Sequence, residues 1–331
     1  MKRLLIAFLA AVSLSGLASA EPARTPYEGM EYYNTYNSSN VTSTSGRIAY
    51  SSYLHKVIIS SAAAVTGTGG STVAFYNANG SATGLAFAVS LSTNDITGPR
   101  EYTMDLWMSS GIYAVNMTTG QVGSTQVTYM RNAIPNNAKV WQSSWSYVDV
   151  ATHTLAGGPV LLHSVKVLTK GTGTTSMRLY NSQAAAPAAN SILAQVDLST
   201  VTETDFDVLF SSGLTINCDS IGSGQPAGVL LTFKRNPPQD WEVWRSTMVT
   251  GTITNVSLAT GQYVLGGVVN GTANATGQLT IYDSKGTATR SLAEIDAALT
   301  FGKRMYDVVT SSGITVTHQG TGTFSILYRK K

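Results

Sequence analysis

Ser211-Ser212-Gly213-Leu214, with Asp207 four residues before it, is the middle copy of a pattern that the chain carries three times. The other copies are Asp105 with Ser109-Ser110-Gly111-Ile112 and Asp307 with Ser311-Ser312-Gly313-Ile314. The copies stand about one hundred residues apart, whereas solenoid repeats are roughly 20 to 45 residues long and need their neighbours to complete a core. Each unit here is therefore large enough to bury a core of its own.

Two further landmarks flank this pattern in every copy, always in the same order. Before it stand Phe75-Tyr76-Asn77, Leu179-Tyr180-Asn181 and Ile281-Tyr282-Asp283. After it comes an aromatic run that ends on basic residues, at 127–131, 231–235 and 326–330. Landmarks that recur in a fixed order indicate a tandem repeat rather than chance.

Apolar and polar residues alternate between these landmarks, which is the period of a half-buried β-strand. In the middle unit Phe206, Val208 and Phe210 fall on one face, and the first unit has apolar residues at the same positions. A slip of one residue would turn all of them to the other face, so the agreement fixes the register. Only 291–299 carries a helix-start signal, and because its copies look extended we expect a strand there too.

The sequence therefore predicts an all-β protein of three tandem antiparallel β-sandwich repeats that follow a signal peptide. Six to eight short strands per unit suit a jelly-roll or an immunoglobulin-like topology, although the Cys…Trp…Cys signature of antibody domains is absent from the sequence. The predicted parts are a signal peptide at 1–20, a flexible or strand-donating segment at 21–45, sandwich repeats at 46–131, 146–235 and 245–331, and Pro/Trp linkers at 132–145 and 236–244.

Residues 1–20 have the three parts of a secretory signal. Lys2 and Arg3 give the positive start, residues 4–12 form the apolar stretch, and Ala18-Ser19-Ala20 makes a small-residue cleavage site. The apolar stretch is too short to cross a bilayer core of about 30 Å. Export is therefore predicted, with no membrane span in the mature chain.

The charge of the chain argues against nucleic acid as a partner. Charged residues make up 12% of the chain, with 21 basic and 18 acidic, and no run of Lys or Arg occurs. Loss of Lys2 and Arg3 with the signal would bring the charge still closer to zero. Nucleic acids and anionic lipid surfaces attract clustered basic residues, which this sequence does not offer.

The Ser-Ser-Gly element predicts a tight turn between two strands. Gly tolerates a positive φ there, and the serine side chains can bond the local backbone. We expect the aspartate ahead of each turn to satisfy turn or loop amides rather than to take part in chemistry.

Four of the five tryptophans lie in the two predicted linkers, at Trp141, Trp145, Trp241 and Trp244. Proline precedes them in both linkers, so we expect stiff connections whose rings pack on the adjoining sandwiches. The alternative is that the rings are exposed and contact a partner or a glycan. The first repeat has no such tryptophan before it, and Tyr33 and Tyr36 are candidates for its place.

No catalytic, cofactor-binding or metal-binding residue is predicted. The four histidines are scattered without the spacing of a metal site, and no nucleophile-elbow motif occurs. Cys218 is the single cysteine and cannot form an internal disulfide. Because its counterparts Asn116 and His318 are polar, we expect it outside the core, as an incidental residue, with an accessible thiol or an intermolecular bridge as alternatives.

The repeated ending of each unit resembles small β-sandwich modules of tailed-phage virion and bacterial surface proteins. In the middle unit this ending is Asp207-Val208, the Ser211-Ser212-Gly213-Leu214 turn and the aromatic run at 231–235. The likeness covers each of the three units and rests on turn and strand residues. It implies a module at a virion surface or on a fibre, and it brings no catalytic residues with it.

These features together predict an exported, non-enzymatic structural or adhesive protein, secreted or at the cell surface. Its repeats would provide reach and multivalent contact. The alternatives are a virion surface, decoration or spike component and a carbohydrate-binding protein. The expected partner is a protein or glycan surface, a homo-oligomer remains open, and no cofactor is expected.

Overall fold

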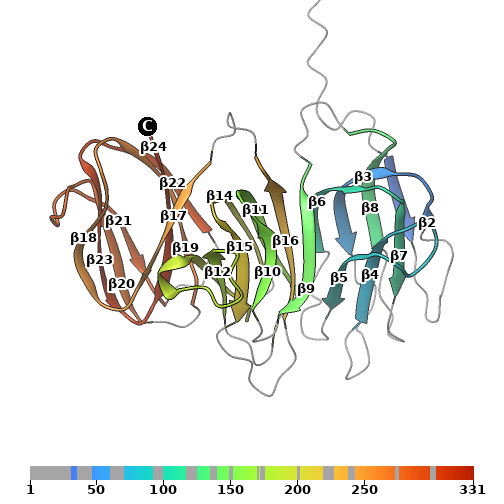
Figure 1. Ribbon diagram of the computed structural model, residues 1–331, viewed down its shortest axis with the longest axis horizontal. Helices are drawn as coiled ribbons and strands as arrows, with labels where there is room; N and C mark the ends of the chain where they lie inside the picture. The colour runs from blue at the N-terminus through green and yellow to red at the C-terminus, as the bar shows by residue number, and fades with distance from the viewer. Residues whose placement is uncertain are drawn as a thin grey trace, which may run out of the picture.

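The computed structural model describes the chain in several ranges between residues 31 and 331. These ranges are 31–35, 47–59, 71–91, 100–116, 125–134, 140–148, 152–169, 171, 176–199, 202–218, 227–237, 243–272, 276–298 and 303–331. The predicted signal peptide at 1–20 lies outside them. The described residues form three β-sandwiches that stand side by side in a row, with the first and third at opposite ends (Figure 1).

The first sandwich contains eight strands. They are β1 (Glu31–Thr35), β2 (Arg47–Ile48), β3 (Ser52–Ile59), β4 (Ser71–Asn77), β5 (Leu85–Leu91), β6 (Arg100–Met108), β7 (Ile112–Asn116) and β8 (Thr125–Arg131). One sheet has the order β1-β8-β3-β6 and the other β2-β7-β4-β5. All of their pairings are antiparallel.

The second sandwich has eight strands and one short 3₁₀ turn. They are β9 (Gln142–Val148), β10 (His153–Gly157), β11 (Val160–Thr169), β12 (Ser176–Asn181), η2 (Ala189–Ser191), β13 (Ile192–Asp197), β14 (Thr202–Phe210), β15 (Gly213–Cys218) and β16 (Ala227–Arg235). The sheets have the orders β14-β11-β16-β9 and β10-β15-β12-β13.

The third sandwich again has eight strands. They are β17 (Arg245–Thr250), β18 (Ile253–Thr260), β19 (Tyr263–Asn270), β20 (Gly277–Tyr282), β21 (Ser291–Asp296), β22 (Lys303–Thr310), β23 (Gly313–Gly320) and β24 (Thr323–Lys330). The sheets have the orders β17-β24-β19-β22 and β18-β23-β20-β21. Residues 291–296 are a strand, as their extended copies predicted.

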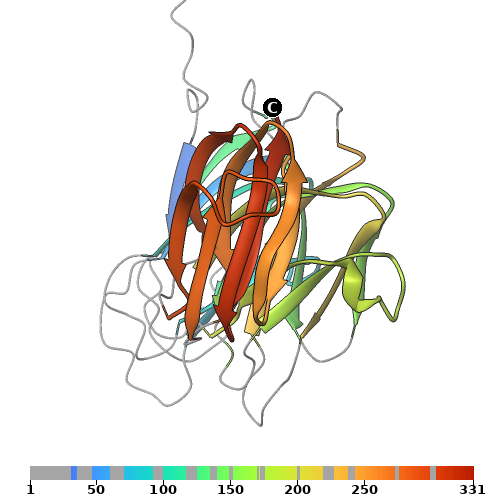
Figure 2. The ribbon, with the colours of Figure 1, turned by 90° about the vertical axis from the view of Figure 1, so that its left-hand side faces the viewer.

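The three sandwiches share one topology. Numbered within each unit, the first sheet has the order 1-8-3-6 and the second 2-7-4-5. Two four-stranded sheets connected in this way form a jelly roll, so of the two topologies left open by the sequence the jelly roll is the one adopted. Figure 2 looks along the row and shows the two layers of the third sandwich in front. The prediction of an all-β fold of three tandem sandwiches is confirmed.

Each sandwich buries an apolar core between its own two sheets, because inward-facing side chains alternate with outward-facing ones along every strand. The first core contains Phe75 and Phe87, whose ring centroids lie 4.6 Å apart. The second contains Phe206 and Phe210, and the third contains Phe324. Each repeat therefore has a core between its own sheets, unlike a turn of a solenoid. Residues of the following sandwich extend the first two clusters across the junctions, namely Leu161, Leu168 and Leu230, and Val269 and Leu327.

The Ser-Ser-Gly turns have the predicted backbone, with φ of 114°, 128° and 144° at Gly111, Gly213 and Gly313. Their amides are satisfied from across the sheet by the polar residue of the upstream landmark. The Ser110 amide donates to Asn77 Oδ1 and the Ser212 amide to Asn181 Oδ1, both at 2.8 Å. In the third unit the Ser311 and Ser312 amides donate to Asp283 Oδ1.

The aspartates ahead of these turns have a different role from the one predicted. Asp105, Asp207 and Asp307 lie inside β6, β14 and β22 and have φ of 52°, 50° and 50°. At each of them the strand register shifts against the neighbouring strand, so each forms a bulge. They do not hold the turn amides, because the side chains of Asn77, Asn181 and Asp283 already do so.

Two expected boundaries differ from the observed strands. Residues 31–35 of the segment predicted to be flexible or strand-donating form β1, which pairs with β8 of its own sandwich. Residues 142–145, expected in a linker, already belong to β9, because Gln142 to Trp145 pair with β16. Tyr33 pairs with Val127 within β1 and so does not occupy the position of a linker tryptophan.

Cys218 is buried in the second core, with 3% of its surface exposed. The expectation that its polar counterparts place it outside the core is wrong. His318, its counterpart in the third unit, is also fully buried, and its Nδ1 lies 2.6 Å from the Gly251 carbonyl oxygen. A polar side chain can face this interior when the backbone supplies a partner.

We predict that Gly313→Ala destabilises the protein more than Gly261→Ala. Both glycines have positive φ, but a methyl group at Gly313 would run into the Ala259 carbonyl oxygen, whereas one at Gly261 would meet nothing within 4 Å. The backbone conformation alone should cost about 1 kcal/mol at either site, and the clash should add at least as much again at Gly313. Urea unfolding of both variants measures the difference, and equal losses would contradict this account.

Candidate functional site

The junctions between the sandwiches bring together the residues that the sequence singled out. Just before β9, Trp141 lies beside Leu106 of β6 in a parallel bridge, and its amide donates to the Asp105 carbonyl oxygen at 3.1 Å. Trp244 repeats this just before β17, beside Val208, with its amide donating to the Asp207 carbonyl oxygen at 2.8 Å. The positive φ of each aspartate thus belongs to the place where the next unit attaches.

Each of these tryptophans closes the core of the sandwich that precedes it. Trp141 is 4% exposed and belongs to the first apolar cluster, and Trp244 packs against the second. Leu106 and Val208, which they flank, are 2% and 0% exposed. Without the ring, the edge of the core at β6 or β14 would face water.

The same rings also rest on the sandwich that follows. The Trp141 ring stacks on His163 of β11, with centroids 4.1 Å apart and planes within 6°. Gly266 of β19 is the counterpart of His163 of β11. In each unit this residue of the third strand lies at the register shift against the sixth strand and has no paired residue there. A methyl group at Gly266 would lie 2.6 Å from the Trp244 ring, so glycine leaves the room that the ring fills.

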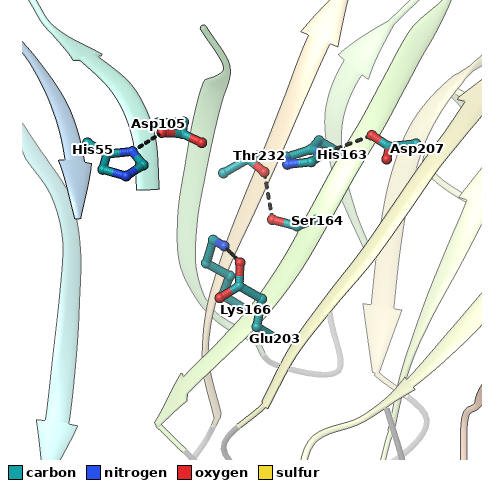
Figure 3. A network of polar contacts seen from close by, with 8 residues as sticks. All are labelled: His55, Asp105, His163, Ser164, Lys166, Glu203, Asp207 and Thr232. Atoms are coloured by element: carbon teal, nitrogen blue, oxygen red, sulfur yellow. Dashed lines mark hydrogen bonds and ion pairs between the residues drawn. The ribbon is translucent and has the colours of Figure 1, made fainter. Parts of the chain in front are cut away.

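Two of the bulge aspartates hold a histidine across the sheet. His163 Nδ1 lies 2.7 Å from Asp207 Oδ1, and His55 Nδ1 lies 2.7 Å from Asp105 Oδ1 (Figure 3). The Tyr53 hydroxyl donates to the same Asp105 oxygen at 2.6 Å. A carboxylate that orients an imidazole is also a feature of catalytic sites. Here the His163 ring lies face to face with Trp141, and the third unit has glycine at this position, which identifies a packing element.

The first interface buries small apolar residues and a tryptophan ring. Strand β5 lies against β9, β11 and β16, and the half-buried Trp145 of β9 packs on a patch of small residues at Ala74, Ala78 and Ala88. Gly228 of β16 leaves room for the Trp145 ring, because a methyl group there would run into it.

The second interface joins equivalent strands with different chemistry. Strand β13 lies against β17, β19 and β24, as β5 lies against β9, β11 and β16. The side-chain Nε2 of its buried Gln195 donates to the Gly271 carbonyl oxygen at 3.3 Å. The backbone amide of Gln195 donates to Ser325 Oγ, also at 3.3 Å. Val269 and Leu327 of the third sandwich also join the apolar cluster of the second sandwich. The arrangement is therefore repeated, with hydrogen bonds added to apolar contacts.

A buried cation lies at the first interface. Lys166 of β11 is 2% exposed, and its ammonium pairs with Glu203 of β14 (Figure 3). Burial lowers the pKa of Lys166 from its usual 10.5 to about 8, while Asp205 and Asp105 act in the opposite direction. Asp105 belongs to the first sandwich, so this charge is shared across the junction.

Two features are absent from the described residues. No group of three or more His, Cys, Asp or Glu side chains among them is placed to hold a metal ion. Within the same ranges no helix is long and apolar enough to cross a membrane.

The predicted contact residues divide as follows. Trp141, Trp145 and Trp244 pack on the sandwiches, as their expected role in stiff junctions requires, and Trp241 lies outside the described residues. Trp141 is too buried to receive a sugar on its ring. The sequence shows that His55 and His163 hold equivalent positions near a strand start, but sequence reasoning missed the junction role of His163 and its equivalence with Gly266. It also missed Lys166. The signal for Gly266 is that it stands as far from the start of the third strand as His163 does.

No protein-family model and no curated protein matches this chain. Several solved structures resemble it, among them the following two. One is described as the atomic structure of Sulfolobus Turreted Icosahedral Virus, with 10% identity over 90% of this chain and 89% of that chain and a TM-score of 0.24. The other concerns the triple jelly roll fold and turret assembly in an archaeal virus, with 10% identity over 91% and 89% and a TM-score of 0.25. Because these scores are so low, neither likeness bears on what this chain does.

A double-mutant cycle tests the Trp244–Gly266 contact. Gly266→Ala should cost about 1–3 kcal/mol of unfolding free energy, since the methyl group overlaps the ring. In the Trp244→Ala background the same change should cost far less, because the obstructing ring is gone. Urea unfolding of the four proteins gives the coupling energy, and additive losses would show that the two residues do not meet.

The stability of the protein should depend on pH through Lys166. The folded chain releases this proton near pH 8 and the unfolded chain near pH 10.5, so unfolding takes up a proton between these values. The free energy of unfolding therefore rises with pH across this window, by on the order of 1–3 kcal/mol. Urea unfolding at several pH values should show that Lys166→Met flattens the rise, and an unchanged slope would contradict the assignment.

Proposed function

We propose that this protein is an exported, non-enzymatic structural component that acts as a stiff spacer or adhesive element on a surface. The observation that carries the proposal is the junction, built twice from the same parts. Sandwiches joined by tightly packed tryptophans and by continuous side-chain packing do not swing freely, whereas loosely joined domains do. Three jelly rolls locked in a row give reach and a fixed presentation of whatever the outer surfaces contact.

The use of the polar groups supports a structural role. The groups best suited to chemistry, the His163–Asp207 pair and Lys166, lie at the junctions and are occupied by stacking or by ion pairing. A general base or nucleophile needs access to a substrate. The Trp141 ring occupies one face of His163, and Lys166 is almost entirely buried.

A virion surface, decoration or spike component is the second candidate. Eight-stranded jelly rolls with this strand order are frequent in viral capsid and lectin domains, which supports the idea as an analogy of fold. A glycan-binding role has less support, because three of the four candidate tryptophans pack against protein. Trp241 alone would have to provide it.

Small-angle X-ray scattering tests the stiff spacer. The chain without residues 1–20 should scatter as one elongated body. Replacing both Trp141 and Trp145 with alanine should loosen the first junction and increase the maximum dimension, while each sandwich keeps its strand content by circular dichroism. If the wild-type curve already requires an ensemble of bent and extended forms, the spacer proposal fails.

Location tests the surface role. Antibodies against the mature chain should detect it in the surface or released fraction of producing cells, in many copies. Presence in purified particles at a fixed ratio to the capsid protein would favour the virion candidate. Retention of an uncleaved chain inside the cell would contradict both.

A further inference from the structure

Among the described residues, no tryptophan flanks strand β22 of the third sandwich as Trp141 and Trp244 flank its two counterparts. Leu106 of β6 and Val208 of β14 are 2% and 0% exposed because a junction tryptophan flanks each of them. Val308 holds the same position in β22, since it pairs with Leu265 as Leu106 pairs with Leu54 and Val208 with Leu162. Val308 is 37% exposed. The third core is therefore open at the edge where the other two are closed.

The exposed surface of this edge is apolar. Met305 and Val309, also on β22, are 48% and 49% exposed. Together with Val308 they make up three of the seven large hydrophobic side chains that are exposed among the described residues. An apolar cluster on a sheet edge is a place where another chain segment can bind.

The backbone of β22 also keeps the attachment geometry. Asp307 has a φ of 50°, as Asp105 and Asp207 do, and in those two the carbonyl oxygen accepts the amide of the following tryptophan. Left-handed backbone at a non-glycine residue is uncommon and costs free energy. In the third unit the bend persists although Gly266 stands where a histidine clamps the aspartate in the other units.

The chain itself indicates what fits this edge. Gln142, the first residue of β9, pairs with Phe233, and Arg245, the first of β17, pairs with Tyr328. Glu31 begins β1 and pairs with Tyr129 in the same way. The residue directly before each start is Trp141, Trp244 and Met30, respectively. Met30 thus holds the sequence position of the two closing tryptophans, and Tyr27 and Glu28 correspond to Trp241 and Glu242.

We propose that the segment at residues 27–30 of a second copy of this chain docks along β22. Met30 of the second copy would lie beside Val308, its amide would donate to the Asp307 carbonyl oxygen, and its carbonyl oxygen would accept the Val309 amide. The last bond repeats the one in which the Leu209 amide donates to the Trp244 carbonyl oxygen at 3.3 Å. Copies would join head to tail by the contact that already joins the sandwiches within one chain, a heterologous contact that extends the row. The inference does not depend on the surface location proposed above.

Two complementary variants of the chain from residue 21 test this by light scattering after size exclusion. One lacks residues 21–30 and keeps the β22 edge, and the other carries Val309→Asp and keeps the leading segment. Wild type should grow beyond one chain mass with concentration, and each variant alone should stay a monomer. Their equimolar mixture should give twice the chain mass and no larger species, because only one productive contact remains.

Val256→Asp is the matched control, because Val256 is 41% exposed on β18 in the other sheet of the same sandwich. It should assemble as wild type does, and the melting temperatures of both aspartate variants confirm that they fold. Hydrogen exchange at the Val309 amide should slow with wild-type concentration. The wild type could instead be a monomer whose Val309 amide exchanges slowly, with faster exchange after deletion of residues 21–30. That result would place the segment on β22 of its own chain and overturn the proposal. Assembly that survives in either variant alone would also overturn it.

Discussion

The closing of one core by the first residue of the next unit is the contact on which the architecture depends. A bulge in the sixth strand of each sandwich puts an aspartate into left-handed backbone at the open end of the core. In the first two sandwiches the carbonyl of that aspartate accepts the amide of a tryptophan. The tryptophan that follows seals this opening and at the same time rests on the third strand of the next sandwich. Because one side chain serves both bodies, the position of one sandwich cannot change without exposing the core of the other.

The two interfaces show that this joint, rather than the surfaces it brings together, sets the arrangement. Both interfaces contain apolar residues, but the first adds a buried Lys166–Glu203 pair and the second adds the hydrogen bonds of Gln195. Both nevertheless place an edge strand of one sandwich, β5 or β13, against the first sheet of the next sandwich. Surfaces of such different chemistry would not be expected to find one geometry independently. The common geometry follows from the shared tryptophan joint, and the side chains of the two interfaces differ within it.

The sequence foretold the fold because the information needed was local. Alternation, the Ser-Ser-Gly turn and its φ > 0 glycine each lie within a few residues, and three copies checked one another. The junction chemistry was not readable in this way. The Trp141–His163 stack joins residues in different sandwiches, and the equivalence of His163 with Gly266 emerges only from strand register. The position of Cys218 was predicted wrongly for a related reason, because its polar counterparts indicated an outward position. His318 shows that the interior accepts a polar ring when the backbone supplies a hydrogen-bond partner.

The aspartate bulge separates what is essential in the repeat from what is accessory. In two units the carboxylate holds a histidine, an arrangement that in another context would suggest acid–base chemistry. The third unit replaces that histidine with glycine and still keeps the left-handed backbone, so the side-chain pair cannot be the reason for the bend. What all three units share is the left-handed backbone at the aspartate, and in both places where a following segment is described the carbonyl of that aspartate accepts its amide. The conserved element is therefore a backbone acceptor for an incoming strand, and the histidine is a clamp that two of the three units add to it.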